Sequence, residues 1–461
     1  MRKPMRSFRY APLAIGVAYL VWMFGTDWLV TLGAFGGILL FLVVMHELGH
    51  FTVAKLIGVR VLEFGVGLPP KAWGIKRGET EYTVNWLPLG GFVRMLGEED
   101  PGDPRSLAAQ AAWKRLAVFA AGPGVNALLP IILLFIAFLV PTQVFVTDVA
   151  VVGVSSGSPA EAAGIQQGDI IREAGGHEIL NSTTLQRVIQ TRLGGDTDWV
   201  IERQGRLIEV HINEVRVDPP ASEGATGIAL TNARVTVASV KNGSTASTSG
   251  IERGDLFLRV GSLMVLSTED ASTAYEAAIA AEPDVAVVIQ MLRRGRFVEL
   301  SASPSLGDLS GFTANVKPEE RRSSSIAEAI SGAFTESWEI LVTFRNEIGR
   351  MVSGSTGIEL AGPVGIAQIT GQVLDEGIGP LVTWAALLSI NLAIVNILPI
   401  PALDGGRITF VLLELVRGGR RISPDKERAV HMAGFALLMS AIMLVTFNDI
   451  QRLVGGFRFF D

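Results

Sequence analysis

Long apolar stretches alternate with polar segments along this chain. The apolar stretches cover residues 10–24, 29–45, about 116–140, 381–398 and 429–447. A helix needs roughly 20 apolar residues to cross a hydrocarbon core of about 30 Å. The pattern therefore predicts an α-helical multi-pass membrane protein with about five spans, of which the first is short.

The first stretch has two interpretations. Arg2, Lys3, Arg6 and Arg9 precede it, and a basic segment followed by a short apolar run is also typical of a cleaved signal peptide. No convincing small-residue cleavage site follows the run. The prediction is five spans if this segment is retained and four if it is removed.

The distribution of Lys and Arg predicts the orientation of the spans. The loops at residues 55–115 and 407–428 are rich in these cations, and cytoplasmic loops carry such an excess. If residues 10–24 cross the membrane, the basic N-terminus and both loops lie on the cytoplasmic side. The polar region at residues 142–305 then lies on the outer side.

That polar region contains an internal repeat. Its glycine motifs recur 86 residues later (157 to 243, 164 to 250, 168 to 254): Gly157-Ser158, Gly164-Ile165 and Gly168-Asp169-Ile170, then Gly243-Ser244, Gly250-Ile251 and Gly254-Asp255-Leu256. A fixed offset indicates duplication of a whole domain. Alternating apolar positions near 199–202 and 285–291 predict strands, and residues 183–191 predict a helix. We expect two small α+β domains, residues 141–216 and 225–305, with a linker at 218–224.

Composition narrows the class of protein. The 461 residues are 49% hydrophobic, with a mean hydropathy of +0.39, which is high for a soluble protein. A formal net charge of −6 gives no basic field, so nucleic acid is not an expected partner. The absence of cysteine excludes disulfides and thiolate chemistry, which leaves His, Asp and Glu as the strong metal ligands.

The strongest chemical signal stands at the end of the second apolar stretch, where the sequence reads His46-Glu47-Leu48-Gly49-His50. Residues four apart share one face of a helix, so His46 and His50 can bind one metal ion with Glu47 beside them. This is the arrangement of zinc hydrolases. Polar groups at the edge of hydrocarbon are costly unless they face water, a partner or a metal, which argues against two idle histidines.

A catalytic zinc site usually takes three protein ligands, and three further histidines are available. His177 and His211 lie in the outer polar region, so the predicted topology keeps them from the site. His431 begins the last span on the cytoplasmic side and stays possible. A carboxylate is the other candidate.

Asp404 is the better candidate for the third ligand. It follows the fourth apolar stretch where the chain returns to the cytoplasmic side, at the predicted depth of the two histidines. Pro399 and Pro401 forbid a regular helix just before it, and the freed backbone groups need a hydrated or protein-lined cavity. The alternative is that Asp404 and the two glycines after it form an ordinary turn.

Several motifs together resemble the site-2 protease family of intramembrane zinc metalloproteases, and most closely the bacterial regulator of sigma-E protease. They are HELGH, NILPIPALDGG from Asn396, the tandem repeat with its PDZ-like pattern GSPAEAAGIQQGDII, FGVGLPPKAW, GETEYTVNWLPLGGFVRMLGE and AAGPGVN from Ala120. The resemblance covers nearly all the chain after about Leu29. The additional first apolar stretch departs from the usual pattern of that group.

The resemblance implies a role for each matching residue. One Zn²⁺ per chain would be held by His46, His50 and Asp404, with Glu47 as general base. Substrate binding would use a second set of residues: Asn396, Pro399 and Pro401 near the metal, and Gly90 and Gly91 in a membrane-associated β-hairpin within residues 79–95 that pairs with an extended substrate. The alternative for this hairpin is a cytosolic cover over the site.

The family further implies a domain plan and partners. The plan is an N-terminal membrane part (1–140), PDZ-like domains (141–216 and 225–305), a linker with an amphipathic helix at 335–351 (306–378) and a C-terminal membrane part (379–461). The expected substrates are single-span membrane proteins, such as an anti-sigma factor or a remnant signal peptide, in the bacterial inner membrane. An upstream site-1-type protease would trim them first, and the PDZ-like domains, which bind peptides, would restrict access to trimmed substrates.

Two other functions compete with this interpretation. A membrane-anchored PDZ scaffold could carry a non-catalytic zinc site, but a structural site needs no base such as Glu47. A metal-dependent channel or transporter is disfavoured, because no other span carries paired ionisable groups.

Overall fold

The structure is a computed structural model that describes residues 27–98, 100–220, 223–353 and 361–454. The chain divides into two compact units. The membrane unit holds residues 1–141, 323–338 and 359–461, and the repeat unit holds residues 142–322 and 339–358. The expected metal ligands all belong to the membrane unit, and the expected duplication belongs to the repeat unit.

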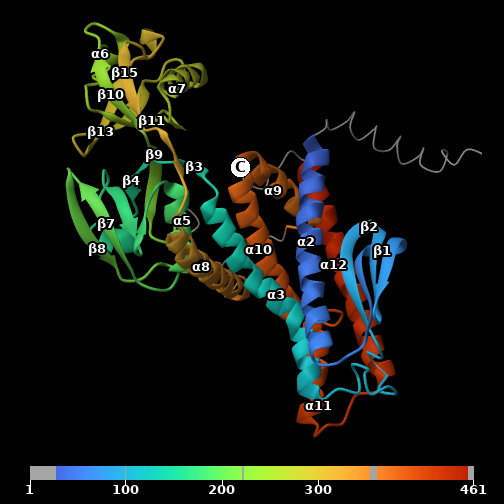
Figure 1. The fold of residues 1–461 in the computed structure, drawn as a ribbon. Helices are drawn as coiled ribbons and strands as arrows, with labels where there is room; N and C mark the ends of the chain where they lie inside the picture. Colours follow the sequence, from blue (N-terminus) through green and yellow to red (C-terminus); the bar gives the residue numbers. More distant parts are fainter. Residues whose placement is uncertain (1–26, 99, 221–222, 354–360, 455–461) are drawn as a thin grey trace, which may run out of the picture. The chain divides into compact units, whose positions relative to one another are not determined.

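Four described helices of the membrane unit are long and apolar enough to cross a membrane. They are α2 (Asp27–Leu56), α3 (Ala112–Leu139), α10 (Ile378–Ile397) and α12 (Pro424–Val454), shown in Figure 1. At 1.5 Å per residue, even α10 with its 20 residues is about 30 Å long, the thickness of a hydrocarbon core. The four later apolar stretches are confirmed as apolar helices of spanning length. The first, residues 10–24, lies outside the described residues.

Two shorter helices of this unit were not expected from the sequence. They are α9 (Pro363–Glu376) and α11 (Asp404–Val416). α10 ends at Ile397, and the two prolines at 399 and 401 lie in the turn that leads to α11, because proline cannot continue a helix. Asp404 therefore stands in the first turn of a new helix.

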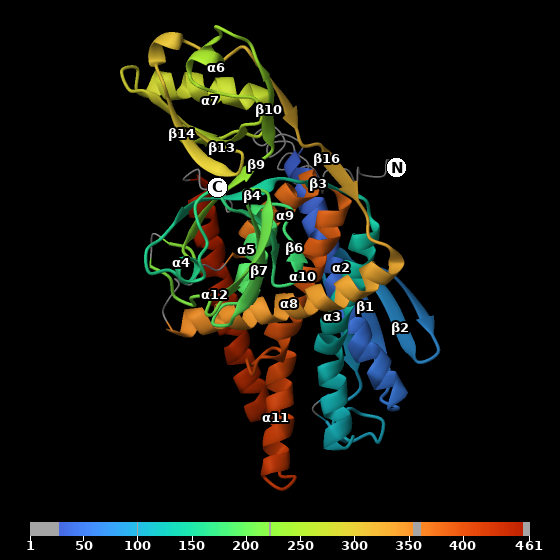
Figure 2. The ribbon, with the colours of Figure 1, turned by 90° about the vertical axis from the view of Figure 1, so that its left-hand side faces the viewer.

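Helix α3 contacts both α2 and α10 (Figures 1 and 2). The two helices approach closely at Gly49, where an added Cβ would lie 2.5 Å from the carbonyl oxygen of Ala121 and 2.9 Å from a methyl of Val125. Only glycine allows two helices to approach this closely. Since Gly49 lies between the two histidines, the approach brings α3 against the predicted metal-binding face of α2.

A β-hairpin follows α2. It consists of β1 (Val61–Arg77) and β2 (Thr80–Met95), which pair antiparallel. Each strand pairs with two separate parts of the other. Val66 of β1 lies opposite both Gly91 and Val84 of β2, and Val84 also lies opposite Trp73 of β1. The range 79–95 given by the resemblance is therefore only the second strand of the hairpin. Within the described chain, the end of β2 at residues 91–95 pairs with β1 alone and forms an edge of this small sheet.

The repeat unit contains two antiparallel sheets of six strands with the same strand order (Figure 2). The first is built from β4 (Asp148–Val154), α4 (Pro159–Ala162), β5 (Ile170–Ala174), β6 (His177–Glu178), α5 (Ser182–Thr191), β7 (Thr197–Arg203), β8 (Arg206–Ile212) and β9 (Ile228–Ala233). The second is built from β10 (Val235–Val240), α6 (Thr245–Thr248), β11 (Leu256–Val260), β12 (Leu263–Met264), α7 (Thr268–Ala281), β13 (Val287–Arg293), β14 (Arg296–Ala302) and β15 (Phe312–Val316). The internal repeat and its predicted strands and helix are thus confirmed.

Each of the two sheets contains an equivalent ion pair between an arginine and a buried aspartate. Arg203 donates to both carboxylate oxygens of Asp169, each at 2.7 Å, and Arg293 does the same to Asp255 at 2.8 Å. Each arginine also donates a hydrogen bond of 2.7 Å to the carbonyl of the glycine that lies just beyond the C-cap of the short helix α4 or α6. Such bidentate pairs fix a loop against a strand, so the duplication preserved a structural device as well as a pattern.

The domain boundaries differ from those expected. Strand β9 pairs with β4 of the first sheet, although its residues fall in the expected range 225–305 of the second domain. Strand β15 pairs with β10 and extends the second sheet to Val316. In each sheet the last strand of the repeat pairs with its first strand, β9 with β4 and β15 with β10. Boundaries drawn at the linker and at residue 305 leave these last strands out of their own domains.

A shared apolar core joins the two sheets. Its buried members are Ala150, Ile170, Ala233, Leu256, Leu258 and Leu292, three from each sheet.

Outside the two six-stranded sheets, β3 (Thr142–Phe145) pairs with β16 (Glu319–Arg322), and α8 spans Ile326–Ser353. The helix expected at 335–351 is therefore present, and it is longer than predicted.

Candidate metal centre

Two histidines and one carboxylate converge between α2 and the start of α11. The Nε2 atoms of His46 and His50 lie 3.1 Å apart. Oδ2 of Asp404 lies 3.0 Å from Nε2 of His46 and 3.2 Å from Nε2 of His50. Both histidines are buried. Among the residues that the structure describes, this is the group of side chains placed to hold a metal ion.

The size of this triangle suits one zinc ion. Ligand atoms at about 2.0–2.2 Å from a tetrahedral zinc lie roughly 3.3–3.5 Å from one another, close to the three observed separations. Three electron-pair donors at this distance repel unless a cation or proton lies between them. The donor set of two imidazoles and one carboxylate is one that zinc accepts.

Helix α3 leaves room for this cation. A Cβ added at Gly122 would lie 2.3 Å from Nε2 of His50 and 2.7 Å from Nε2 of His46. Any side chain at this position would fill the space that the two ligand atoms face. The absence of a side chain at Gly122 leaves space beside the two Nε2 atoms, which supports the fit of the site to a bound ion.

The other ring nitrogens of both histidines contact α3. Nδ1 of His50 lies 2.7 Å from the carbonyl oxygen of Val118, so it donates its proton there. Nδ1 of His46 lies 3.3 Å from the side-chain amide of Asn126. A proton fixed on Nδ1 of His50 leaves its Nε2 free to bind a metal, which is how zinc ligands are usually oriented.

Asp404 is held by tight backbone packing. A Cβ at Gly405 would lie 2.0 Å from the carbonyl oxygen of Leu398, and one at Gly406 would lie 2.6 Å from that of Ile400. The glycines after Asp404 therefore let the first turn of α11 press against the end of α10. Ala402 has a positive φ of 84°, a conformation that costs a residue with a side chain about 1–3 kcal/mol.

His431 supports this loop and lies outside the ligand triangle. Its Nδ1 accepts a hydrogen bond of 2.9 Å from the backbone N–H of Ala402. The sequence allows His431 as a third ligand, whereas the structure places it against the backbone of Ala402. His177 pairs with Glu339 at 3.0 Å and His211 with Asp198 at 2.6 Å, both within the repeat unit.

A cavity of about 410 Å³ opens beside the triangle. Glu47 lines it, and a Cβ at Gly91 of the hairpin would lie 3.4 Å from Cγ of Glu47. Asn396, at the end of α10, lines the same cavity. Gly90 precedes Gly91 in the hairpin with a φ of 79°. Pro399 and Pro401 lie in the turn before α11, outside the residues that line the cavity.

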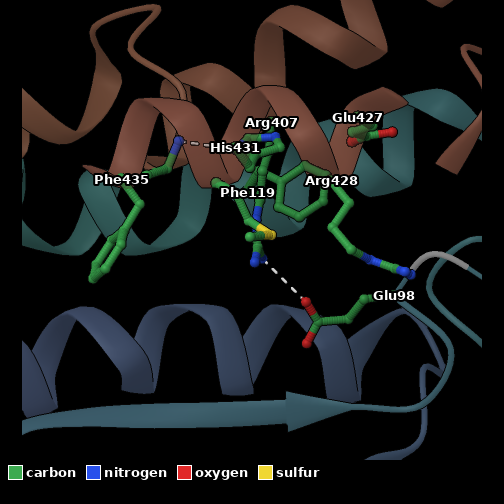
Figure 3. Close-up of a pocket in the computed structure, with 9 residues that line it drawn as sticks. Glu98, Phe119, Arg407, Glu427, Arg428, His431 and Phe435 are labelled. Carbon is green, nitrogen blue, oxygen red and sulfur yellow. Dashed lines mark hydrogen bonds and ion pairs between the residues drawn. The ribbon is translucent and has the colours of Figure 1, made fainter. Parts of the chain in front are cut away.

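A second pocket of about 290 Å³ adjoins this cavity and shares four of its lining residues. Figure 3 shows Arg407 directed at Glu98 across it, an ion pair of 3.2 Å. The guanidinium of Arg407 also lies over the ring of Phe119 at 5.6 Å. His431 lines this second pocket (Figure 3), so the residue that supports the Asp404 loop is reached from this side.

Sequence reasoning missed the contribution of α3. Gly122 and Asn126 belong to the motif AAGPGVN, which indicates no role for either. No sequence pattern indicates the buried pair of Arg115 with Glu414, which makes two contacts of 2.7 Å. A polar amide in an apolar helix was the available signal for Asn126. That signal does not identify a partner 80 residues away.

Comparison with known proteins decides the family. Residues 34–441 match Peptidase family M50. The chain belongs to this family. A zinc metalloprotease RasP of Geobacillus kaustophilus is 31% identical, over 89% of this chain and 95% of the relative. The regulator of sigma-W protease RasP of Bacillus subtilis is 30% identical, over 89% and 96%, and the putative zinc metalloprotease NMA0084 of Neisseria meningitidis is 29% identical, over 92% and 100%.

Membership in family M50 confirms the resemblance to site-2 proteases. The protein is a zinc metallopeptidase of the membrane, with Zn²⁺ as its cofactor. Its four apolar helices of spanning length agree with a membrane protein.

Proposed function

We propose that this M50 peptidase hydrolyses peptide bonds of single-span membrane proteins at the site formed by His46, His50, Asp404 and Glu47. The observation that carries the proposal is the convergence of two imidazoles and a carboxylate at 3.0–3.2 Å. They line one cavity with Glu47, and both histidines belong to an apolar helix of spanning length. A purely structural metal site requires no additional carboxylate at this position.

Each residue of the site has a distinct role. His46, His50 and Asp404 hold the zinc ion, one per chain, and keep its net charge positive, because only one of the three ligands is anionic. When bound, zinc supplies Lewis-acid polarisation of a carbonyl group and lowers the pKa of water to about 7. Glu47 follows His46 directly and takes up the proton of the attacking water, then passes it to the leaving amine.

The substrate must be extended to react, because a helix hides its carbonyl groups in its own hydrogen bonds. The edge of the hairpin at residues 91–95 supports such binding. It pairs on one side with β1 and lines the cavity with Phe92 and Val93, so an unwound substrate segment can add as a further strand. Gly90 and Gly91 place no side chains on this edge beside Glu47. Asn396 can hydrogen-bond the extended backbone of the substrate. Pro399 and Pro401 shape the turn next to it.

The repeat unit suggests a selection step before catalysis. We assign its two sheets as PDZ-like domains on the outer side of a bacterial inner membrane, with the active site toward the cytoplasm. They would bind peptides and admit substrates that an upstream protease has trimmed. One relative is named regulator of sigma-W protease, which favours anti-sigma factors as substrates here, with remnant signal peptides as a second class.

The replacement Glu47→Gln tests the proposal. It removes the base and keeps the shape of the side chain, so cleavage of a transmembrane model substrate by purified protein in detergent should be lost while the zinc content stays near one per chain. Glu376→Gln, at the exposed end of α9, is the matched control and should cleave normally. Unchanged cleavage by Glu47→Gln would overturn the assignment of the active site.

A further inference from the structure

One face of α3 follows the metal site. Val118, Gly122 and Asn126 are spaced four residues apart, so they lie on one face of the helix. Val118 contacts His50, Gly122 faces both Nε2 atoms, and Asn126 contacts His46. A role for Asn126 at this site rests on the proposed function only in taking His46 as a zinc ligand.

The two histidines differ in how their ring protons are fixed. A backbone carbonyl can only accept, so the contact with Val118 sets the proton of His50 on Nδ1. For His46 the partner is a side-chain amide, which offers a donor on one side and an acceptor on the other. The orientation of that amide decides whether Nε2 of His46 is free to bind a metal.

The hydrogen bonding of Asn126 is incomplete as the amide stands. Its Nδ2 faces Nδ1 of His46 at 3.3 Å, while its Oδ1 is buried without a hydrogen-bond partner. The side chain is fully buried, and a buried carbonyl without a hydrogen-bond partner destabilises the folded protein. With Nδ2 as donor, the proton of a neutral His46 would sit on Nε2 and point at Asp404 and His50.

We propose that Asn126 directs Oδ1 to His46 and is the residue that holds the proton of His46 on Nδ1. Turning the amide by 180° exchanges its two ends. Nδ1–H of His46 then donates to Oδ1, the carbonyl gains a partner, and Nε2 presents its electron pair to the metal position. Asn126 thereby acts on His46 as the carbonyl of Val118 acts on His50.

The position of Asn126 is fixed independently of His46. The hydroxyl of Ser389 on α10 donates a hydrogen bond of 2.8 Å to its backbone carbonyl, and Gly122 one turn earlier keeps α3 against the histidines. Asn126 is therefore a positioning residue, whose effect on the reaction passes through His46. A simple packing role for a buried amide between helices is the competing explanation.

Zinc affinity tests the proposal without using activity. In full-length protein in detergent, competition with a chromophoric chelator should show that Asn126→Leu binds zinc about 10- to 100-fold more weakly, the usual effect of losing such a partner. Asn126→Asp keeps an acceptor of the same shape and should bind within a few-fold of the unchanged protein. The visible absorption of the Co²⁺-loaded Asn126→Asp protein should also keep the form of a site with both imidazoles bound.

Two comparisons make the outcome decisive. Asn391→Leu removes another amide of a spanning helix that lies outside the cavity lining, and its zinc affinity should not change. His46→Ala serves as the reference for loss of a ligand. Should Asn126→Leu bind zinc normally while His46→Ala does not, the positioning role is wrong and the metal assignment stands. Should Asn126→Asp bind as weakly as His46→Ala, the amide acts as a donor or only packs, and the proposal also fails.

Discussion

The proposed metal centre combines two regions that position their side chains in opposite ways. His46 and His50 come from the interior of α2, where the spacing of a regular helix places both imidazoles on one face. Asp404 comes from the first residue of α11, after a turn with two prolines and an alanine of positive φ. The histidine pair is thus defined by local geometry, whereas the carboxylate depends on contacts from elsewhere in the fold.

Those contacts come mainly from glycine packing and from α12. Gly405 and Gly406 let α11 approach the end of α10, and Gly434 of α12 is so close that its added Cβ would lie 2.4 Å from Pro401. His431 accepts the hydrogen bond of Ala402. Changes outside these three residues should therefore disturb the Asp404 region more than the histidine helix.

Loss of the carboxylate should have the largest effect. Asp404→Asn removes the proposed anionic ligand and keeps the side-chain shape, so we expect loss of cleavage. Zinc binding should weaken by more than the roughly 10- to 100-fold that loss of an outer partner costs. Chelator competition and metal analysis of the purified protein measure this. Full zinc occupancy in Asp404→Asn would show that another group completes the site. The zinc affinity of His46→Ala gives the corresponding loss for a histidine of α2.

The next largest effect is expected from a single added methyl group, which should lower stability near Asp404 but not on the histidine helix. In Gly434→Ala the new Cβ meets Pro401 at 2.4 Å, and overpacking of this kind costs about 1–3 kcal/mol. Thermal unfolding in detergent should occur at a lower temperature and zinc affinity should fall, because the turn before Asp404 must move.

Gly36→Ala on α2 is the matched control, since no heavy atom lies within 4 Å of its added Cβ. Replacing an unhindered helical glycine gains up to about 1 kcal/mol in helix propensity, so stability should be unchanged or slightly higher. Equal losses of stability in the two variants would remove the contrast between the regions.

The same contrast explains how much the sequence could predict. The proximity of His46 to His50 was predictable from their spacing, and the approach of Asp404 to both was predictable from the apolar stretches and the basic loops. Helix α11 was not predicted, because its 13 residues are too few to form a span and follow a turn with two prolines. The duplication was predicted from its glycine motifs, but the place of β9 in the first sheet was not, because strand pairing is a tertiary choice.

Residues that act through space were beyond the reach of pattern reasoning. Asn126 lies 80 positions from His46, and the pair of Arg115 with Glu414 spans 299 positions. Neither shows a periodicity that differs from ordinary helix packing. The membrane pattern locates the spans along the chain, whereas the rotation of each span about its axis depends on close contacts such as Gly49 against Ala121.

The smallest effect is expected at His431. Replacement by Phe keeps a ring next to Phe410, which lies 5.3 Å away, but removes the acceptor for the N–H of Ala402, a hydrogen bond worth about 0.5–1.5 kcal/mol. Zinc affinity and cleavage should fall only a few-fold, and His431→Gln, which can still accept, should lie between this variant and the unchanged protein. A drop as large as that of Asp404→Asn would mean that His431 contacts the metal in the working enzyme, and the division into a locally defined pair and a supported carboxylate would no longer hold.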